Sequence, residues 1–315
     1  MTTITTMLTP AQQKVADELL CLTEDRPVAD PSWAPELRAW IDEALADHVP
    51  RIREKRLWIS KGTISGVLGC EANYVGGRGE FAWSPKTARG DIVHRAVALT
   101  AAGSNAEPRD LAWAAIDQAK AHGSRSLATW LRGLPAADRV ALAAEALPGV
   151  DSWVTNWPPL RAAWRPVPEY PVSADLAAGR IHVAGRVDLS LGNNRVSSDG
   201  EMRRRRLLVE VKTGASNPDH RAEHLLYALV ECLMTGVAPW RAATYYTDSG
   251  TWVADMITEE LLQVAAGRLA AAVRRVIELA DGREPMRQAG WQCGFCTLAD
   301  GCTERAVAGR AEHEG

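Results

Sequence analysis

Three charged residues lie in two apolar segments that have the pattern of neighbouring strands. Asp188 is near the end of the segment 180–189, and Glu210 and Lys212 belong to Leu207-Leu-Val-Glu-Val-Lys212. Because side chains alternate along a strand, Glu210 and Lys212 project from the same face. Burying such charges is unfavourable unless something neutralises them. A divalent cation held by both carboxylates and the backbone carbonyl of Val211 would do so, which predicts an oxygen-ligand site for Mg²⁺ or Mn²⁺.

A cation at this place would favour hydrolysis of a phosphodiester bond. It lowers the pKa of water and stabilises charge on the phosphate. Lys212 would then hold the attacking water or the scissile phosphate. The alternative interpretation is a buried ion pair between Glu210 and Lys212, with Asp188 at a turn. The three residues taken alone leave both interpretations open.

A second group with chemical potential is a cluster of cysteines near the C-terminus. Cys293, Cys296 and Cys302 follow the pattern C-x2-C-x5-C. Six cysteines in a chain of this length are too few for a disulfide framework, and in a reducing compartment such a cluster indicates metal or cluster ligation. Three thiolates leave a tetrahedral site one ligand short, so either zinc or a [4Fe–4S] cluster would take a fourth ligand from elsewhere. The spacing alone does not separate the two.

The elements that must position these groups are predicted by hydrophobic periodicity and by helix caps. Helices are expected over about 10–20 and 36–48, from about residue 90 through His94, and in several short pieces between 105 and 165. Strands with turn signals between them are expected later in the chain, over 167–172, 180–189, 207–212, 242–246 and 251–255. Two further helices are expected over 217–236 and 258–281.

Composition narrows the possible classes of protein. The 315 residues are 46% hydrophobic and 24% charged, as in ordinary globular proteins. The net charge of −3 does not indicate a nucleic-acid coat protein, although a local basic groove is compatible with it. No apolar run reaches the roughly 18 residues needed to cross a bilayer, and the first residues do not have the pattern of a secretory signal. We therefore expect a cytoplasmic protein that does not contact a membrane.

One basic run is a candidate nucleic-acid contact. It consists of Arg203, Arg204, Arg205 and Arg206. Phosphate groups attract such runs. The alternative is an ordinary solvated face.

Sequence motifs around the charged strands resemble those of a known family. Gly185-Arg-Val-Asp188 and Val209-Glu-Val-Lys-Thr-Gly214 are similar to the signature of the PD-(D/E)XK nucleases, in particular the RecB-like exonucleases. Gly90-Asp-Ile-Val-His94 resembles the upstream G-x-x-x-H segment of that family. The resemblance implies that Asp188 and Glu210 hold a catalytic cation, that His94 is a further metal ligand, and that Lys212 positions or activates the water.

Two further positions bear on this resemblance. The family has Q-x-x-x-Y in the helix after the E-x-K strand, and this chain has Glu223-His-Leu-Leu-Tyr227. Tyr227 matches and would support the substrate or the site, whereas Glu223 departs from the pattern. Glu169 stands where these proteins usually carry an acidic residue before the first core strand.

The cysteine pattern extends the resemblance. Cys70 follows Ser60-Lys-Gly-Thr-Ile-Ser-Gly-Val-Leu-Gly, which resembles the segment before the first cluster cysteine in iron–sulfur RecB-like nucleases, including AddB and the CRISPR-associated exonucleases. The resemblance implies that Cys70 joins Cys293, Cys296 and Cys302 around a [4Fe–4S] cluster. It covers about residues 58 to 305, and the combination of motifs is more specific than any one of them.

The expected fold is α/β, with a restriction-endonuclease-like core in which a mixed central sheet is flanked by helices. Residues 1–57 would form an N-terminal helical extension and residues 58–315 a RecB-like nuclease domain. That domain would carry a helical insertion over about 105–165 and a cysteine segment over 291–303.

The resemblance implies a metal-dependent DNA nuclease that acts on single strands or ends, in repair, recombination, or anti-phage or CRISPR-type processing. The sequence has no G-x-x-x-x-G-K-[ST] loop, so unwinding would come from a helicase or another repair or defence subunit. One alternative is a catalytically silent, DNA-binding subunit of a larger helicase or defence complex. Another is a zinc-stapled protein with an unrelated activity.

Overall fold

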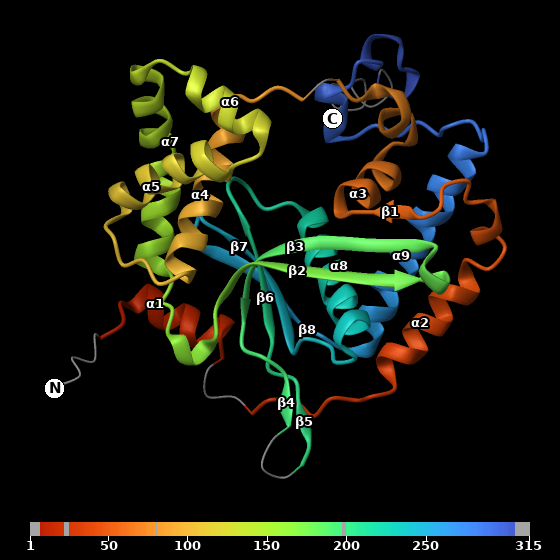
Figure 1. Ribbon diagram of the computed structural model, residues 1–315, viewed down its shortest axis with the longest axis horizontal. Helices are drawn as coiled ribbons and strands as arrows, with labels where there is room; N and C mark the ends of the chain where they lie inside the picture. The colour runs from red at the N-terminus through yellow and green to blue at the C-terminus, as the bar shows by residue number, and fades with distance from the viewer. Residues whose placement is uncertain (1–6, 22–24, 80, 197–199, 306–315) are drawn as a thin grey trace, which may run out of the picture.

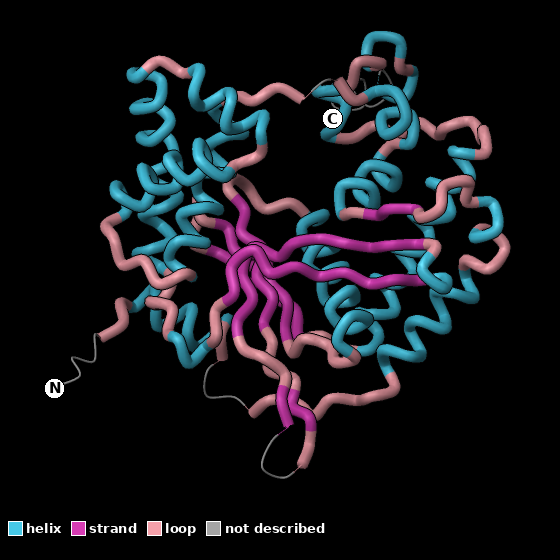
Figure 2. Tube along the Cα trace, viewed as in Figure 1, coloured by secondary structure: helices cyan, strands magenta, loops and turns pink. Residues whose placement is uncertain are grey.

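The protein is built on a six-stranded mixed sheet (Figures 1 and 2). The computed structural model describes residues 7–21, 25–79, 81–196 and 200–305. Its strands are β1 (Leu57–Ile59), β2 (Val167–Leu176), β3 (Ile181–Leu191), β6 (Leu207–Lys212), β7 (Arg241–Tyr246) and β8 (Thr251–Met256). The order is β1-β3-β6-β7-β8, and β2 pairs with the other edge of β3. The predicted mixed sheet is therefore present.

The longest strand, β3, organises the sheet. Its antiparallel pairing with β2 runs from Ile181 to Ser190, whereas its opposite edge is shared by two strands. β1 pairs in parallel with 181–183, and β6 pairs antiparallel with 189–191. β6 pairs in parallel with β7, which forms an antiparallel hairpin with β8. β6 is thus an interior strand, and Glu210 and Lys212 lie in it.

Helices cover both faces of the sheet. One hydrophobic core lies between the sheet and the helices drawn on the right in Figure 1, which are α2 (Trp33–Ala44), α3 (Lys61–Gly69), α8 (Pro218–Thr235) and α9 (Glu259–Ala280). α8 begins as expected, because Asn217 caps it and Pro218 occupies the first helical position.

The opposite side carries a helical lobe, drawn on the left in Figure 1. Its members are α4 (Pro85–Ala101), α5 (Pro108–His122), α6 (Arg125–Gly133) and α7 (Ala136–Asn156). They share a core of their own, and a second core joins the end of the lobe to β3, β6 and β7. Trp153 and Trp157 stack there with ring centroids 4.4 Å apart, so these two tryptophans pack in the core as expected.

The N-terminal region is helical where the structure describes it. α1 (Pro10–Lys14) starts with a Thr9 capping box and continues into a π-helical turn at Val15–Leu19. A short ribbon of β4 (Arg195–Val196) and β5 (Met202–Arg203), not expected from the sequence, extends the loop before β6. No helix in the described ranges has the length and apolarity required to span a bilayer.

Candidate functional site

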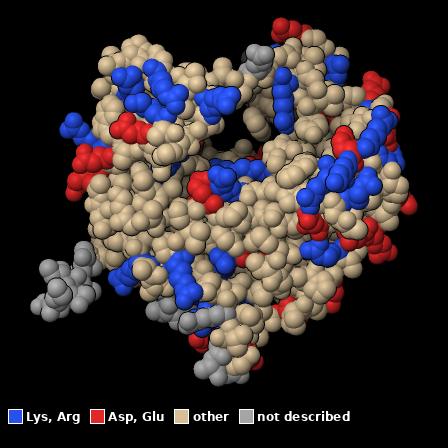
Figure 3. Space-filling model, in the orientation of Figure 1, with Lys and Arg blue, Asp and Glu red and all other residues tan. Residues whose placement is uncertain are grey.

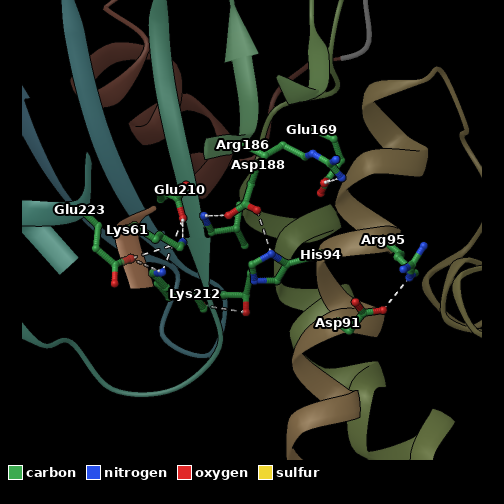
Figure 4. A network of polar contacts seen from close by, with 12 residues as sticks. Lys61, Asp91, His94, Arg95, Glu169, Arg186, Asp188, Glu210, Lys212 and Glu223 are labelled. Atoms are coloured by element: carbon green, nitrogen blue, oxygen red, sulfur yellow. Dashed lines mark hydrogen bonds and ion pairs between the residues drawn. The ribbon is translucent and has the colours of Figure 1, made fainter. Parts of the chain in front are cut away.

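The expected charged residues meet at the sheet beside the helical lobe. Asp188 of β3 lies next to the central part of β6, and His94 of α4 faces it (Figure 4). The Nδ1 atom of His94 is 3.0 Å from Asp188 Oδ1, and the Val211 N–H donates a 2.7 Å hydrogen bond to Oδ2. Both carboxylate oxygens are therefore oriented by neighbours.

The pairing of Asp188 with His94 sets their charges. Burial alone would raise the pKa of Asp188, but His94 and the Val211 N–H outweigh it and hold the pKa below its usual value. Burial would likewise lower the pKa of His94, and the Asp188 carboxylate outweighs it and raises the pKa. The geometry favours an ionised Asp188.

Glu210 is the most buried acid of the cluster. Its side chain is 1% exposed, and burial together with the Asp188 charge raises its pKa to about 7. The Oε2 atom lies 3.2 Å from Lys61 Nζ and 3.5 Å from Lys212 Nζ. Oε1 has no hydrogen-bond partner among the described residues. A buried carboxylate oxygen without a partner is unusual, and a bound cation would satisfy it.

Two lysines and a third acid complete the cluster. Lys212 Nζ is 2.6 Å from Glu223 Oε2, and Lys61 Nζ is 3.5 Å from the same oxygen. With Asp188 and Glu210, the cluster holds three carboxylates against two ammonium groups (Figure 4). Carboxylate oxygens are the ligands that Mg²⁺ and Mn²⁺ prefer, so the donor types of the cluster fit either ion. Within the described ranges, however, no three His, Cys, Asp or Glu side chains converge closely enough to hold an ion as placed.

Sequence reasoning missed Lys61. It is the first residue of α3, where a positive charge opposes the helix dipole, and Ser60 caps the helix before it. This placement was the available sequence signal. A lysine in the first turn of a helix is unfavourable on its own, which indicates an acidic partner elsewhere in the fold. Glu223, expected only as a departure from a motif, is the closest partner of Lys212.

Tyr227 lies beneath the cluster rather than at its surface. It is 3% exposed, and its ring centroid is 5.5 Å from Lys61 Nζ. The ring packs on Gly185 of β3 so closely that a Cβ there would be 2.4 Å from Tyr227 Cε1. Glycine at 185 therefore makes room for the ring that supports Lys61.

Gly185→Ala should lower the free energy of unfolding by about 1–3 kcal/mol, because the added methyl overlaps a buried ring. Urea unfolding followed by circular dichroism measures the change. Gly133→Ala is the matched control, since nothing lies within 4 Å of a Cβ at that position in α6. Equal effects of the two substitutions would contradict the packing described.

The four expected cysteines line one pocket. Cys70 follows the last turn of α3, and Cys293, Cys296 and Cys302 come from the C-terminal segment. All four are free thiols. Hydrogen bonds from the N–H groups of Arg305 and Glu304 lower the pKa of Cys302, which favours the thiolate that a metal or cluster requires.

The C-terminal segment is held against the residues after α3. The Thr297 N–H donates a 2.9 Å hydrogen bond to the Gly77 carbonyl, and Arg78 and Cys296 form an isolated β-bridge. A Cβ on Gly77 would lie 2.7 Å from Cys296 Sγ, so only glycine admits this approach. Segments more than 200 residues apart in sequence thus lie side by side (Figure 1), and both contribute residues to the cysteine pocket.

The expectation of a nucleic-acid contact at Arg203–Arg206 is corrected for two of its residues. Arg204 is 5% exposed, and its guanidinium donates hydrogen bonds to the carbonyls of Pro239 and Ile257. Arg206 Nε is 2.6 Å from the buried Glu231 carboxylate. Side chains that satisfy buried acceptors are not available to phosphates.

Arg203, Arg205 and Glu169 are the other residues that the sequence singled out. Arg203 pairs with Glu201 at 2.6 Å, and Arg205 is half-buried. Glu169 pairs with Arg186 at 3.3 Å, beside the cluster rather than within it (Figure 4). The acidic cluster therefore consists of Asp188, Glu210 and Glu223.

No family model and no curated protein matches the chain. Among solved structures, the crystal structure of SSO0001 is similar at a TM-score of 0.31 and 11% sequence identity, over 84% of this chain and 94% of that one.

Proposed function

We propose that the protein is a metal-dependent nuclease that hydrolyses phosphodiester bonds of DNA, acting on single strands or ends. The observation that carries the proposal is a pair of contacts on adjacent strands, His94 of α4 with Asp188 of β3 and Lys212 with Glu210 of β6. The unpartnered Oε1 of Glu210 supports a cation between the two strands. The same residues belong to the sequence motifs that resemble those of RecB-like exonucleases.

Asp188, Glu210 and His94 would hold a Mg²⁺ or Mn²⁺ ion, with the Val211 carbonyl as a further oxygen ligand. The cation would supply Lewis-acid stabilisation of phosphate charge and activation of water. Lys212 orients the acidic oxygens through its contact with Glu210 and presents an ammonium group to the phosphate or to the attacking water. Glu223 fixes the Lys212 ammonium at 2.6 Å, which limits its motion.

The core would belong to the restriction-endonuclease-like type, with the acidic residues at adjacent strands. We further propose that Cys70, Cys293, Cys296 and Cys302 bind a [4Fe–4S] cluster. The common pocket supports this, and the close contact of the two segments through Gly77 and Cys296 supports a structural role. The protein would act with a helicase or another repair or defence subunit.

Cleavage of labelled DNA by the anaerobically purified protein tests the proposal. Single-stranded, duplex and RNA substrates are incubated with Mg²⁺, with Mn²⁺, and with a chelator. We expect cleavage of single-stranded DNA or of DNA ends with either metal and none with the chelator. Absence of cleavage for every substrate would favour the alternative, a silent nuclease-fold subunit that binds DNA.

A further inference from the structure

A pocket adjoins the acidic cluster on the side away from His94. We propose that this pocket, called here the α9 pocket and lined by Lys61, Ser65, Glu223, Leu226, Arg268 and Leu269, binds the phosphate next to the cleaved linkage of the DNA strand. Arg268 and Ser65 would hold that phosphate. The inference rests on the proposed function, because it assigns a second contact to the DNA strand that the acidic cluster would cleave.

The position of the α9 pocket follows from the residues that it shares with the cluster. Lys61 and Glu223 belong to both, and Glu223 lies on the opposite side of Glu210 from His94 (Figure 4). Beyond Glu223 the pocket continues between α3, α8 and α9. A DNA strand whose cleaved phosphodiester bond lies at Asp188 and Glu210 would thus place its neighbouring phosphate beside these helices.

The charges of the α9 pocket suit an anion. Lys61 reaches Glu210 and Glu223, so its charge is shared with the cluster. Across the part of the chain that the structure describes, no ion pair or side-chain hydrogen bond engages the Arg268 guanidinium, whereas Arg275 on the same helix approaches Glu71 at 3.7 Å. An unengaged guanidinium is the group best suited to bind phosphate through two N–H groups.

The remaining wall of the α9 pocket is apolar. Ile64, Leu226 and Leu269 line it, and Leu226 and Leu269 are buried. This apolar wall lowers the local dielectric constant beside Arg268, which strengthens the attraction of its guanidinium for a phosphate group.

Binding of a fluorescein-labelled single-stranded oligothymidylate, measured by anisotropy without divalent cations over a series of salt concentrations, tests the assignment. Arg268→Gln should raise the Kd about fivefold. It should also lower the slope of log Kd against log salt by about one, which corresponds to the loss of one phosphate contact. Arg268→Lys keeps the charge and should retain most of the slope. Arg274→Gln is the matched control, because it removes a charge from α9 outside the pocket.

Each outcome has a distinct consequence. Equal effects of Arg268→Gln and Arg274→Gln, with thermal unfolding showing both variants folded, would overturn the α9 pocket as a phosphate site and leave the proposed cleavage untouched. A selective loss in Arg268→Gln, in a protein that cleaves nothing with metal, would support the pocket and count against the proposed function. Failure of the unmodified protein to bind the oligonucleotide would overturn the α9 pocket as a phosphate site, and the proposed function would still be decided by the cleavage assay with Mg²⁺ or Mn²⁺.

Discussion

Lys212→Ala should lower the rate of metal-dependent DNA cleavage by about 100- to 1,000-fold, the usual cost of losing one preorganised electrostatic group. The Lys212 ammonium contacts Glu210 at 3.5 Å and Glu223 at 2.6 Å. Its loss leaves three carboxylates against Lys61 alone, which repels the phosphate as well as removing a donor. Single-turnover cleavage with Mn²⁺ at saturating protein measures the chemical step.

Lys86→Ala is the matched control for this variant. Lys86 is exposed in the first turn of α4, about two helical turns before His94. We expect it to cleave at the rate of the unmodified protein. If Lys212→Ala cleaves as fast as Lys86→Ala, Lys212 has no part in the reaction and the observed activity must be assigned elsewhere.

Cys70→Ala should release iron and lower the free energy of unfolding by several kcal/mol. Ligation of Cys70 together with Cys293 closes a loop of 223 residues (293 minus 70). Such a closure constrains the unfolded chain by on the order of 5 kcal/mol. Without Cys70 the C-terminal segment would be held by the Gly77–Thr297 hydrogen bond and the Glu71–Arg283 ion pair, without the covalent ligation.

Iron and acid-labile sulfide contents, together with urea unfolding under anaerobic conditions, measure these effects. Cys232→Ala is the control for metal content, because Cys232 is buried in α8 among apolar side chains. It should keep its iron. A colourless unmodified protein with stoichiometric zinc would contradict the iron–sulfur proposal while leaving the four-cysteine pocket in place.

Local signals predicted the main elements of this fold and part of its candidate site. The apolar run before Lys212, the Asn217 cap and the hairpin at 242–255 each depend on neighbouring residues, so periodicity and caps were sufficient. β1 has only three residues, and its pairing with β3 depends on a partner more than 120 residues away. No local pattern could have indicated it.

The errors and omissions at the site have the same physical origin. Arg204 is buried because Trp33, Pro239 and Ile257 converge on its guanidinium from distant parts of the chain. Lys61 joins the cluster because α3 packs beside α8 and α9. The charge of an arginine or lysine suggests exposure, and only the tertiary contacts show which of them are enclosed.

A manganese titration tests the central claim, that Asp188 and Glu210 share a divalent cation, most directly. The free-Mn²⁺ electron paramagnetic resonance signal should show one bound ion per chain in the unmodified protein, and at least about tenfold weaker binding in Asp188→Asn. Asp91→Asn, which alters an acid of α4 that is paired with Arg95, should bind as the unmodified protein does. Equal affinities for all three proteins would contradict a cation between the two strands.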